Sequence, residues 1–157
     1  MSSVLETAYE QMQGRVGEQT SQSEWFEVTQ DRINDYADVS MDHQWIHVDV
    51  DRANTESPFG APIAHGNLTL AIMGHLPMAS VAEGPKLKGQ KLGINYGFDR
   101  IRFPSPVPVG TKIRATSTLK RVEIKGGMLQ TMNEVVVDAQ GTDKHVCVAE
   151  SLGRMVF

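Results

Sequence analysis

Cysteine is nearly absent from this chain of 157 residues, and Cys147 is its single representative. A lone cysteine cannot form an internal disulfide, and its alternating neighbours in HVCVAE indicate a packed strand residue rather than a nucleophile. Long hydrophobic runs are missing as well. The opening segment MSSVLETAYE carries acidic residues and no uninterrupted apolar stretch, so it resembles neither a signal peptide nor a spanning helix. We expect a cytoplasmic protein without a membrane partner.

Basic residues are few and scattered. Lys and Arg number 15 against 19 Asp and Glu, which gives a formal net charge of −4. Without a long basic run, nucleic acid is not expected as a partner. A hydrophobic content of 40% over this length suits one core. Residues 1–157 are therefore expected to form a single domain.

The first half of the chain carries helix signals around a short β-rich stretch. Ser3 and Glu6 form a capping box that predicts a helix through about residue 13. β-formers within 16–28 predict at least one strand. Thr29 is the predicted N-cap of a second helix, which runs out near residue 40. The segment MDHQWIHVD that follows is dense in ionisable groups, as is typical of a functional loop.

A helix that needs cover on most sides is predicted between Pro62 and Pro77. The apolar residues of IAHGNLTLAIMGHL point in nearly every direction around a helix. About fourteen residues are too few to span a bilayer. The expected cover is a β-sheet of the same protein.

Everything after Lys91 indicates strands joined by turns. The apolar alternation changes face near Asp99, which predicts a bulge, and Gly126-Gly127 predicts a hairpin turn. The proline-rich segment 104–110 cannot join a central ladder. Sequential antiparallel strands with one inserted helix predict an α+β class in which the sheet curls around the helix.

Three segments together resemble the MaoC-like dehydratases, in particular the branch that includes nodulation protein N. They are DHQWIHVD, SPFGAPIAHGNLTL and NYGFDRIRFPSPVPVG, and the likeness covers nearly the whole chain. It implies a hot-dog fold, in which an antiparallel sheet wraps a long central helix. It also implies hydration of trans-2-enoyl-CoA thioesters to (R)-3-hydroxyacyl-CoA, or the reverse dehydration.

The signature of this family is an aspartate, four intervening residues and a histidine, followed later by alanine-histidine-glycine. Asp42, His47 and Ala64-His65-Gly66 meet it in order and spacing. Hydration needs a base for water, an acid for the α-carbon and a donor for the developing oxyanion. A neighbouring carboxylate and imidazole can hold one water and exchange the proton roles. The Gly66 amide, at the start of a helix and without a side chain, is the expected oxyanion donor.

Further site residues have two interpretations each. His65 can bind near the oxyanion donor or bond structurally across the start of the helix. Trp45 can wall the acyl pocket or pack in the core. Asn95 and Tyr96 can line the substrate cleft or belong to an exposed strand.

The resemblance also implies partners. A homodimer or higher homo-oligomer is expected, with two sheets joined edge to edge and a substrate tunnel along the subunit boundary. Lys86, Lys88 and Lys91 are candidates for the coenzyme A phosphates. No pair of histidines has metal-ligand spacing, so no metal is expected. The implied hydration requires no redox cofactor.

Two alternatives stay open. A hot-dog thioesterase would direct water at the carbonyl carbon, and a non-catalytic protein would only bind acyl thioesters. The second alternative is suggested by Met41, where many family hydratases have glycine, and by Gln44-Trp45, where many have asparagine-proline.

Overall fold

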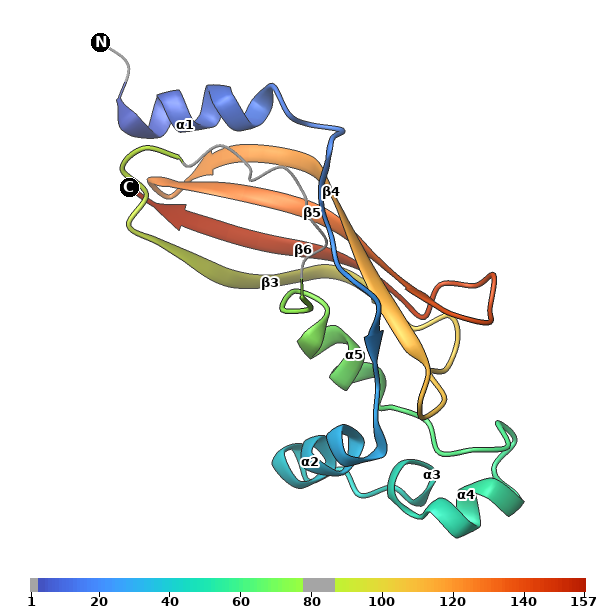
Figure 1. Ribbon diagram of the computed structural model, residues 1–157. Coiled ribbons are helices and arrows are strands. Elements are labelled where there is room, and N and C mark those ends of the chain that lie inside the picture. The colour runs from blue at the N-terminus through green and yellow to red at the C-terminus, as the bar shows by residue number, and fades with distance from the viewer. Residues whose placement is uncertain (1–2, 78–86) are drawn as a thin grey trace.

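The structure is a computed structural model that describes residues 3–77 and 87–157. Five helices and six strands are assigned within these ranges (Figure 1). The helices are α1 (Val4–Gln13), α2 (Gln30–Ser40), α3 (Trp45–Val48), α4 (Val50–Glu56) and α5 (Gly66–Ile72). The strands are β1 (Gln19–Gln22), β2 (Phe26–Glu27), β3 (Leu92–Arg102), β4 (Lys112–Lys125), β5 (Met128–Ala139) and β6 (Cys147–Val156).

The strands form one antiparallel sheet in the order β1-β4-β5-β6-β3, and β2 pairs with the N-terminal end of β4. The predicted hairpin between β4 and β5 is confirmed. Gly126 and Gly127 have φ values of 61° and 74°, the left-handed pair that a tight type I′ turn requires. A register shift between Phe98 and Ile101 confirms the bulge predicted near Asp99, and a further shift lies between Asn95 and Gly97.

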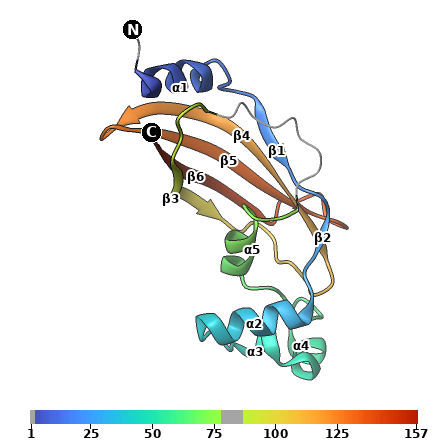
Figure 2. The same cartoon turned by 60° about the vertical axis from the view of Figure 1, so that its left-hand side comes forward.

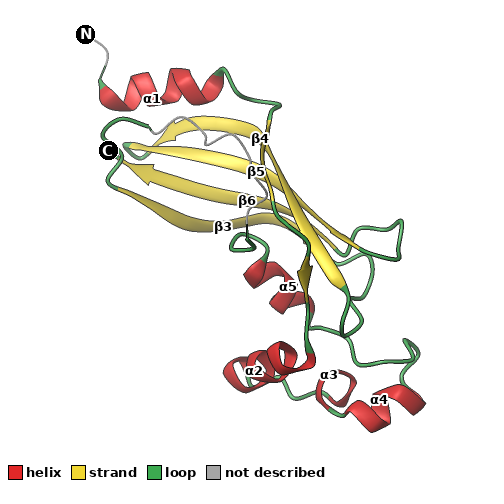
Figure 3. Ribbon diagram, viewed as in Figure 1, coloured by secondary structure: helices red, strands yellow, loops and turns green. Residues whose placement is uncertain are grey.

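The central helix is shorter than the sequence pattern predicts. Helix α5 has seven residues, Gly66–Ile72, and the chain continues through turns from Met73. Gly74, a poor helix former, and Pro77 explain why the apolar pattern outlasts the helix. Figures 2 and 3 show α5 between the curved sheet and the group of α2, α3 and α4. The antiparallel sheet curled against a helix is the predicted α+β architecture.

The main core joins α5 and the start of α2 to the sheet. Val28 and Ile33 flank the α2 N-cap and are both fully buried in this cluster. Cys147 belongs to the same cluster, and burial raises the pKa of its thiol to about 11. The prediction of a packed cysteine is confirmed.

Both predicted helix caps are present. The Ser3 hydroxyl accepts from the Glu6 amide and the Glu6 carboxylate accepts from the Ser3 amide, while Thr29 accepts from the amide of Arg32. The ionisable segment after α2 is not purely a loop, because it includes α3 and leads directly into α4. Within the described ranges, no helix is long and apolar enough to cross a membrane.

Candidate active site

Asp42 lies on a short connection between α2 and α3. It follows Met41, which ends α2 in the left-handed conformation with φ 62°. Local bonds shape the connection, since the Asp42 amide donates to Ser40 Oγ at 3.3 Å and Asp42 Oδ1 accepts from the Gln44 amide at 3.3 Å. The Asp42 residue is exposed, so its carboxylate is accessible from solvent.

His47 lies on the single turn of α3 and is 6% exposed. Its Nδ1 donates to the carbonyl oxygen of Ile63 at 2.6 Å, which leaves Nε2 as the nitrogen with a free lone pair. The carbonyl of His47 accepts from Gln30 Nε2 at 2.8 Å, so α2 fixes the backbone of this turn. Burial lowers the pKa of His47 below 6.5, although the Ile63 hydrogen bond acts in the opposite direction. The imidazole is therefore neutral at pH 7 and available as a base.

His65 lies directly before α5 and is 3% exposed. Its Nε2 is 2.9 Å from the backbone oxygen of Asp42, which fixes Nε2 as the protonated nitrogen because a carbonyl only accepts. The ring stacks on His47 with centroids 3.8 Å apart, and Tyr36 packs against it at 5.0 Å. The predicted bond across the start of the helix is thus present, with Asp42 as its partner.

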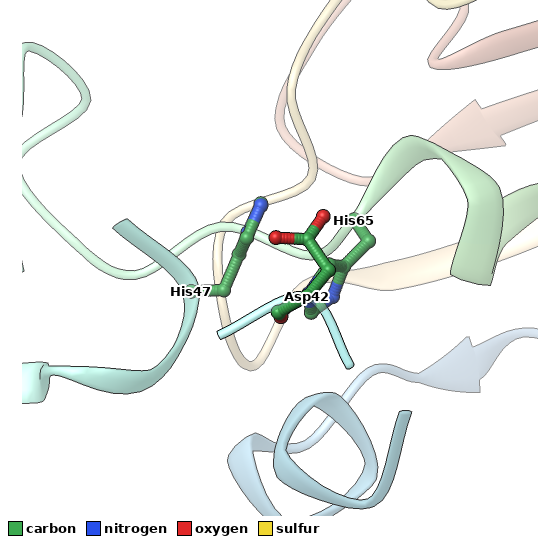
Figure 4. Close-up of side chains that lie close together, drawn as sticks. All are labelled: Asp42, His47 and His65. Carbon is green, nitrogen blue, oxygen red and sulfur yellow. The ribbon is translucent and has the colours of Figure 1, made fainter. Parts of the chain in front are cut away.

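The side chains of Asp42, His47 and His65 converge from three separate segments (Figure 4). One ligand atom from each residue lies within 4.8 Å of the other two. Metal-ligand spacing in the sequence did not predict this cluster. His47 Nδ1 and His65 Nε2 each bond a backbone carbonyl, so His47 Nε2, His65 Nδ1 and the Asp42 carboxylate are the atoms of this cluster that remain for a ligand.

Two pockets meet at this cluster. The first has a volume of about 310 Å³ and is mainly apolar, with Phe59, Phe103 and Val146 among its lining residues. The second has a volume of about 220 Å³ and is mainly polar, and it includes Asp42. His47 and Gly66 line both pockets. A ligand at this junction can place an apolar part in one pocket and its reacting atoms beside Asp42 and His47.

Gly66 is closely covered by an aromatic ring. A Cβ atom on Gly66 would lie 2.8 Å from Cδ2 of Phe103, so any larger residue here would force the Phe103 ring to move. Among the residues that the structure describes, no acceptor pairs with the Gly66 amide. The amide is therefore free to donate to a ligand.

The structure places other predicted site residues outside both pockets. Trp45 is half-buried and its ring packs under the guanidinium of Arg52, 4.2 Å from the ring centroid. Asn95 and Tyr96 lie exposed on β3, where Arg154 covers the Tyr96 ring at 3.5 Å. None of the three predicted residues lines a pocket that contains His47.

The predicted phosphate-binding lysines are only partly described. Lys86 lies outside the described residues. Lys88 is exposed and lines a separate pocket against α1. Lys91 donates to the backbone oxygen of Phe157 at 3.0 Å.

Sequence reasoning missed several residues of the site. Tyr36, Ser40 and Asn67 line the polar pocket, and the Ile63 carbonyl orients His47. A backbone carbonyl has no sequence signal. Asn67 does have one, because it directly follows the alanine-histidine-glycine motif.

The fold and the site together define a class of protein. In this class an antiparallel sheet packs around a helix, and an aspartate-histidine pair from another segment lies beside the first residues of that helix. The profile of the MaoC-like domain family matches residues 11–141. The chain therefore belongs to the MaoC-like dehydratase family.

Two curated relatives agree with this assignment. The 3-hydroxyacyl-thioester dehydratase Z of Mycobacterium tuberculosis is 48% identical over 141 residues, which cover 89% of this chain and 90% of the relative. Nodulation protein N of Rhizobium leguminosarum bv. viciae is 40% identical, with 86% and 83% covered. Among solved structures, the (R)-hydratase from A. caviae shares the fold with a TM-score of 0.67 at 22% identity, with 88% of this chain and 94% of that chain covered.

Proposed function

We propose that this protein hydrates trans-2-enoyl thioesters to (R)-3-hydroxyacyl thioesters, or catalyses the reverse dehydration, with Asp42 and His47 as the catalytic pair. The observation that carries the proposal is the meeting of a neutral imidazole, a carboxylate and an unpaired amide at the junction of two pockets. The names of the dehydratase and hydratase relatives support the same reaction class. The (R) configuration is taken from the family resemblance.

The separation of Asp42 and His47 suits one shared water. No direct hydrogen bond or ion pair joins these two described side chains, yet their ligand atoms lie within 4.8 Å. A water about 2.8 Å from each atom bridges such a gap. Asp42 and His47 would hold this water and aim its oxygen at the β-carbon.

The proposed step balances with a single proton carrier. His47 Nε2 takes a proton from water as the water oxygen bonds to the β-carbon and the double bond shifts toward the carbonyl. The Asp42 carboxylate stabilises the imidazolium that forms. His47 then returns the proton to the α-carbon, so the elements of one water are added across the double bond.

The Gly66 amide would hold the thioester oxygen while negative charge develops on it. The apolar pocket beside Gly66, about 310 Å³ in volume, would receive hydrocarbon of the acyl group. None of these steps uses a metal or a redox cofactor. Coenzyme A is the proposed carrier, and Lys88 and Lys91 stay candidates for contact with its phosphates.

The exposed edge of β3 supports a homodimer. This strand ends the sheet, and Leu92, Ile94 and Tyr96 are 48%, 42% and 52% exposed. Apolar side chains on an open edge strand favour pairing with a second copy. We expect light scattering to give the mass of a dimer and Ile94→Lys to give a monomer. A wild-type monomer would remove this part of the proposal.

A cytoplasmic location accords with a single buried cysteine.

Incubation with crotonyl-coenzyme A tests the reaction. Loss of the enoyl absorbance without free thiol supports the hydratase, and chiral analysis of the product tests the (R) configuration. Release of thiol would instead indicate a thioesterase. Tight binding without turnover, unchanged in Asp42→Asn, would indicate a non-catalytic binding protein.

A further inference from the structure

We propose that His65 is a positioning residue that sets Asp42 against His47, which deepens the proposed function and rests on it. His65 would act through the backbone of Asp42 and not through the substrate. This role differs from the substrate-binding interpretation of His65 and extends the structural one.

The hydrogen bonds of Asp42 carry the argument. Its bonds to Ser40 and Gln44 join residues two positions apart and only shape the connection itself. The bond from His65 Nε2 to the Asp42 oxygen spans 23 positions. Among the described residues, it is the hydrogen bond that ties Asp42 to another part of the fold.

The same short segment also fixes the other parts of the site. The Ile63 carbonyl orients His47, His65 holds Asp42, and Gly66 offers its amide. The segment is itself anchored, since the Ile63 amide donates to the Ile46 oxygen at 3.1 Å and the Ala64 amide to the Val107 oxygen at 2.8 Å. One rigid template therefore sets the relative positions of the base, the carboxylate and the donor.

The environment of His65 is built for one tautomer. Its ring packs against His47 and Tyr36, and its Nδ1 is buried with no partner among the described residues. A hydrogen on Nδ1 would have no acceptor there, which is unfavourable for a buried N–H group. The tautomer with hydrogen on Nε2 supplies the donor that the Asp42 oxygen accepts from.

Two variants separate the donor from the ring. His65→Phe keeps an aromatic ring for stacking but removes the donor, whereas His65→Gln keeps an N–H at a similar reach. A misplaced catalytic group commonly costs about 100-fold in rate. We expect His65→Phe to lose about that factor in kcat with KM changed less than about twofold, and His65→Gln to recover most of the loss.

A second measurement distinguishes positioning from loss of structure. If His65 acts through Asp42, His65→Phe lowers kcat far less in an Asp42→Asn background than in the wild type, because the two changes remove one unit. Thermal unfolding of each variant reports folding separately. Additive losses, or a folded His65→Phe with wild-type kcat, would overturn the inference.

Failure of this inference differs from failure of the proposed function. Nitrogen-15 NMR of the resting protein tests the tautomer without any turnover, and hydrogen on Nε2 of His65 is the expected result. A wild type that does not hydrate crotonyl-coenzyme A removes the proposed function even if this tautomer is found. Hydrogen on Nδ1 in an active wild type removes the inference and leaves the function standing.

Discussion

The Nδ1–H of His47 donates to the carbonyl oxygen of Ile63 at 2.6 Å, and this bond decides which nitrogen of the imidazole can act as a base. Nε2 keeps its lone pair, and it is the nitrogen that the proposed mechanism uses as the base beside Asp42. A side chain from one helical turn is thereby oriented by the backbone that leads into α5.

Asp42→Asn and His47→Gln should each lower kcat by about 100-fold or more, because His47 carries the proton and Asp42 holds the water and stabilises the imidazolium. Asparagine keeps the shape of Asp42 but not its charge. His43→Gln is the matched control, because His43 is exposed and, within residues 3–77 and 87–157, pairs only with Asp38, at 2.8 Å. Steady-state kinetics with crotonyl-coenzyme A and circular dichroism check activity and folding. Wild-type kcat in either catalytic variant would disprove the assignment.

The pH dependence should follow the lowered pKa of His47. Since the proposed base is neutral, kcat/KM should fall on the acid side with a midpoint below 6.5. The coulombic influence of Asp42 raises this pKa, so the midpoint in an NMR titration of His47 should move lower in Asp42→Asn. An acid limb above 6.5 would contradict a buried neutral base.

Stability should follow the same group. The unfolded chain binds the His47 proton at a higher pH than the folded protein does, because folding lowers the pKa. The contribution is therefore fully present above about pH 6.5 and is lost as the pH falls through the lower, folded pKa. Urea unfolding at several pH values in this window should give a free energy of unfolding that changes less steeply with pH for His47→Gln than for the wild type.

Local sequence signals made the helix caps and the hairpin turn predictable. The capping box at Ser3 and Glu6, the cap at Thr29 and the Gly126-Gly127 turn each act within a few residues, and the structure contains all of them. The length of α5 was not predictable from apolar spacing. Apolar residues beyond Ile72 remain buried in turns, as Met73 and Leu76 show.

The site was predictable only as far as its motif. The resemblance to the family motif identified Asp42, His47 and Gly66, but the link between His65 and the Asp42 oxygen joins residues 23 positions apart. Its acceptor is a backbone atom, which no side-chain pattern reveals. The sequence suggested that Trp45 walls the acyl pocket, whereas in the structure its ring packs against Arg52.

Gly66→Ala should reduce both stability and activity. Its new Cβ would lie 2.8 Å from the Phe103 ring, and such overpacking costs roughly 1–3 kcal/mol. Adding Phe103→Ala removes the steric conflict and should recover part of the stability lost to it. If kcat stays low in the double variant, the methyl group also blocks the carbonyl from the amide. Wild-type activity in Gly66→Ala would argue against the oxyanion role.

Cys147 should resist alkylation while the protein is folded. Burial raises its pKa to about 11, and the thiolate is the reactive form. Mass spectrometry after iodoacetamide at pH 8 should find an unmodified native protein and a singly modified protein in urea. Rapid labelling of the native state would contradict the core position on β6.

Met41→Gly should stabilise the protein slightly without reducing activity. Met41 is the one non-glycine residue with positive φ among residues 3–77 and 87–157, at 62°, and its side chain is 83% exposed. A left-handed conformation costs an L-residue about 1–2 kcal/mol, and the greater freedom of glycine in the unfolded chain offsets about half of the gain. We expect the free energy of unfolding to rise by less than about 1 kcal/mol.

Val39 is equally exposed at 83% but lies within α2, so Val39→Gly should change stability in the opposite direction. Urea unfolding measures both variants. A large fall in kcat/KM for Met41→Gly alone would mean that this side chain contacts the substrate.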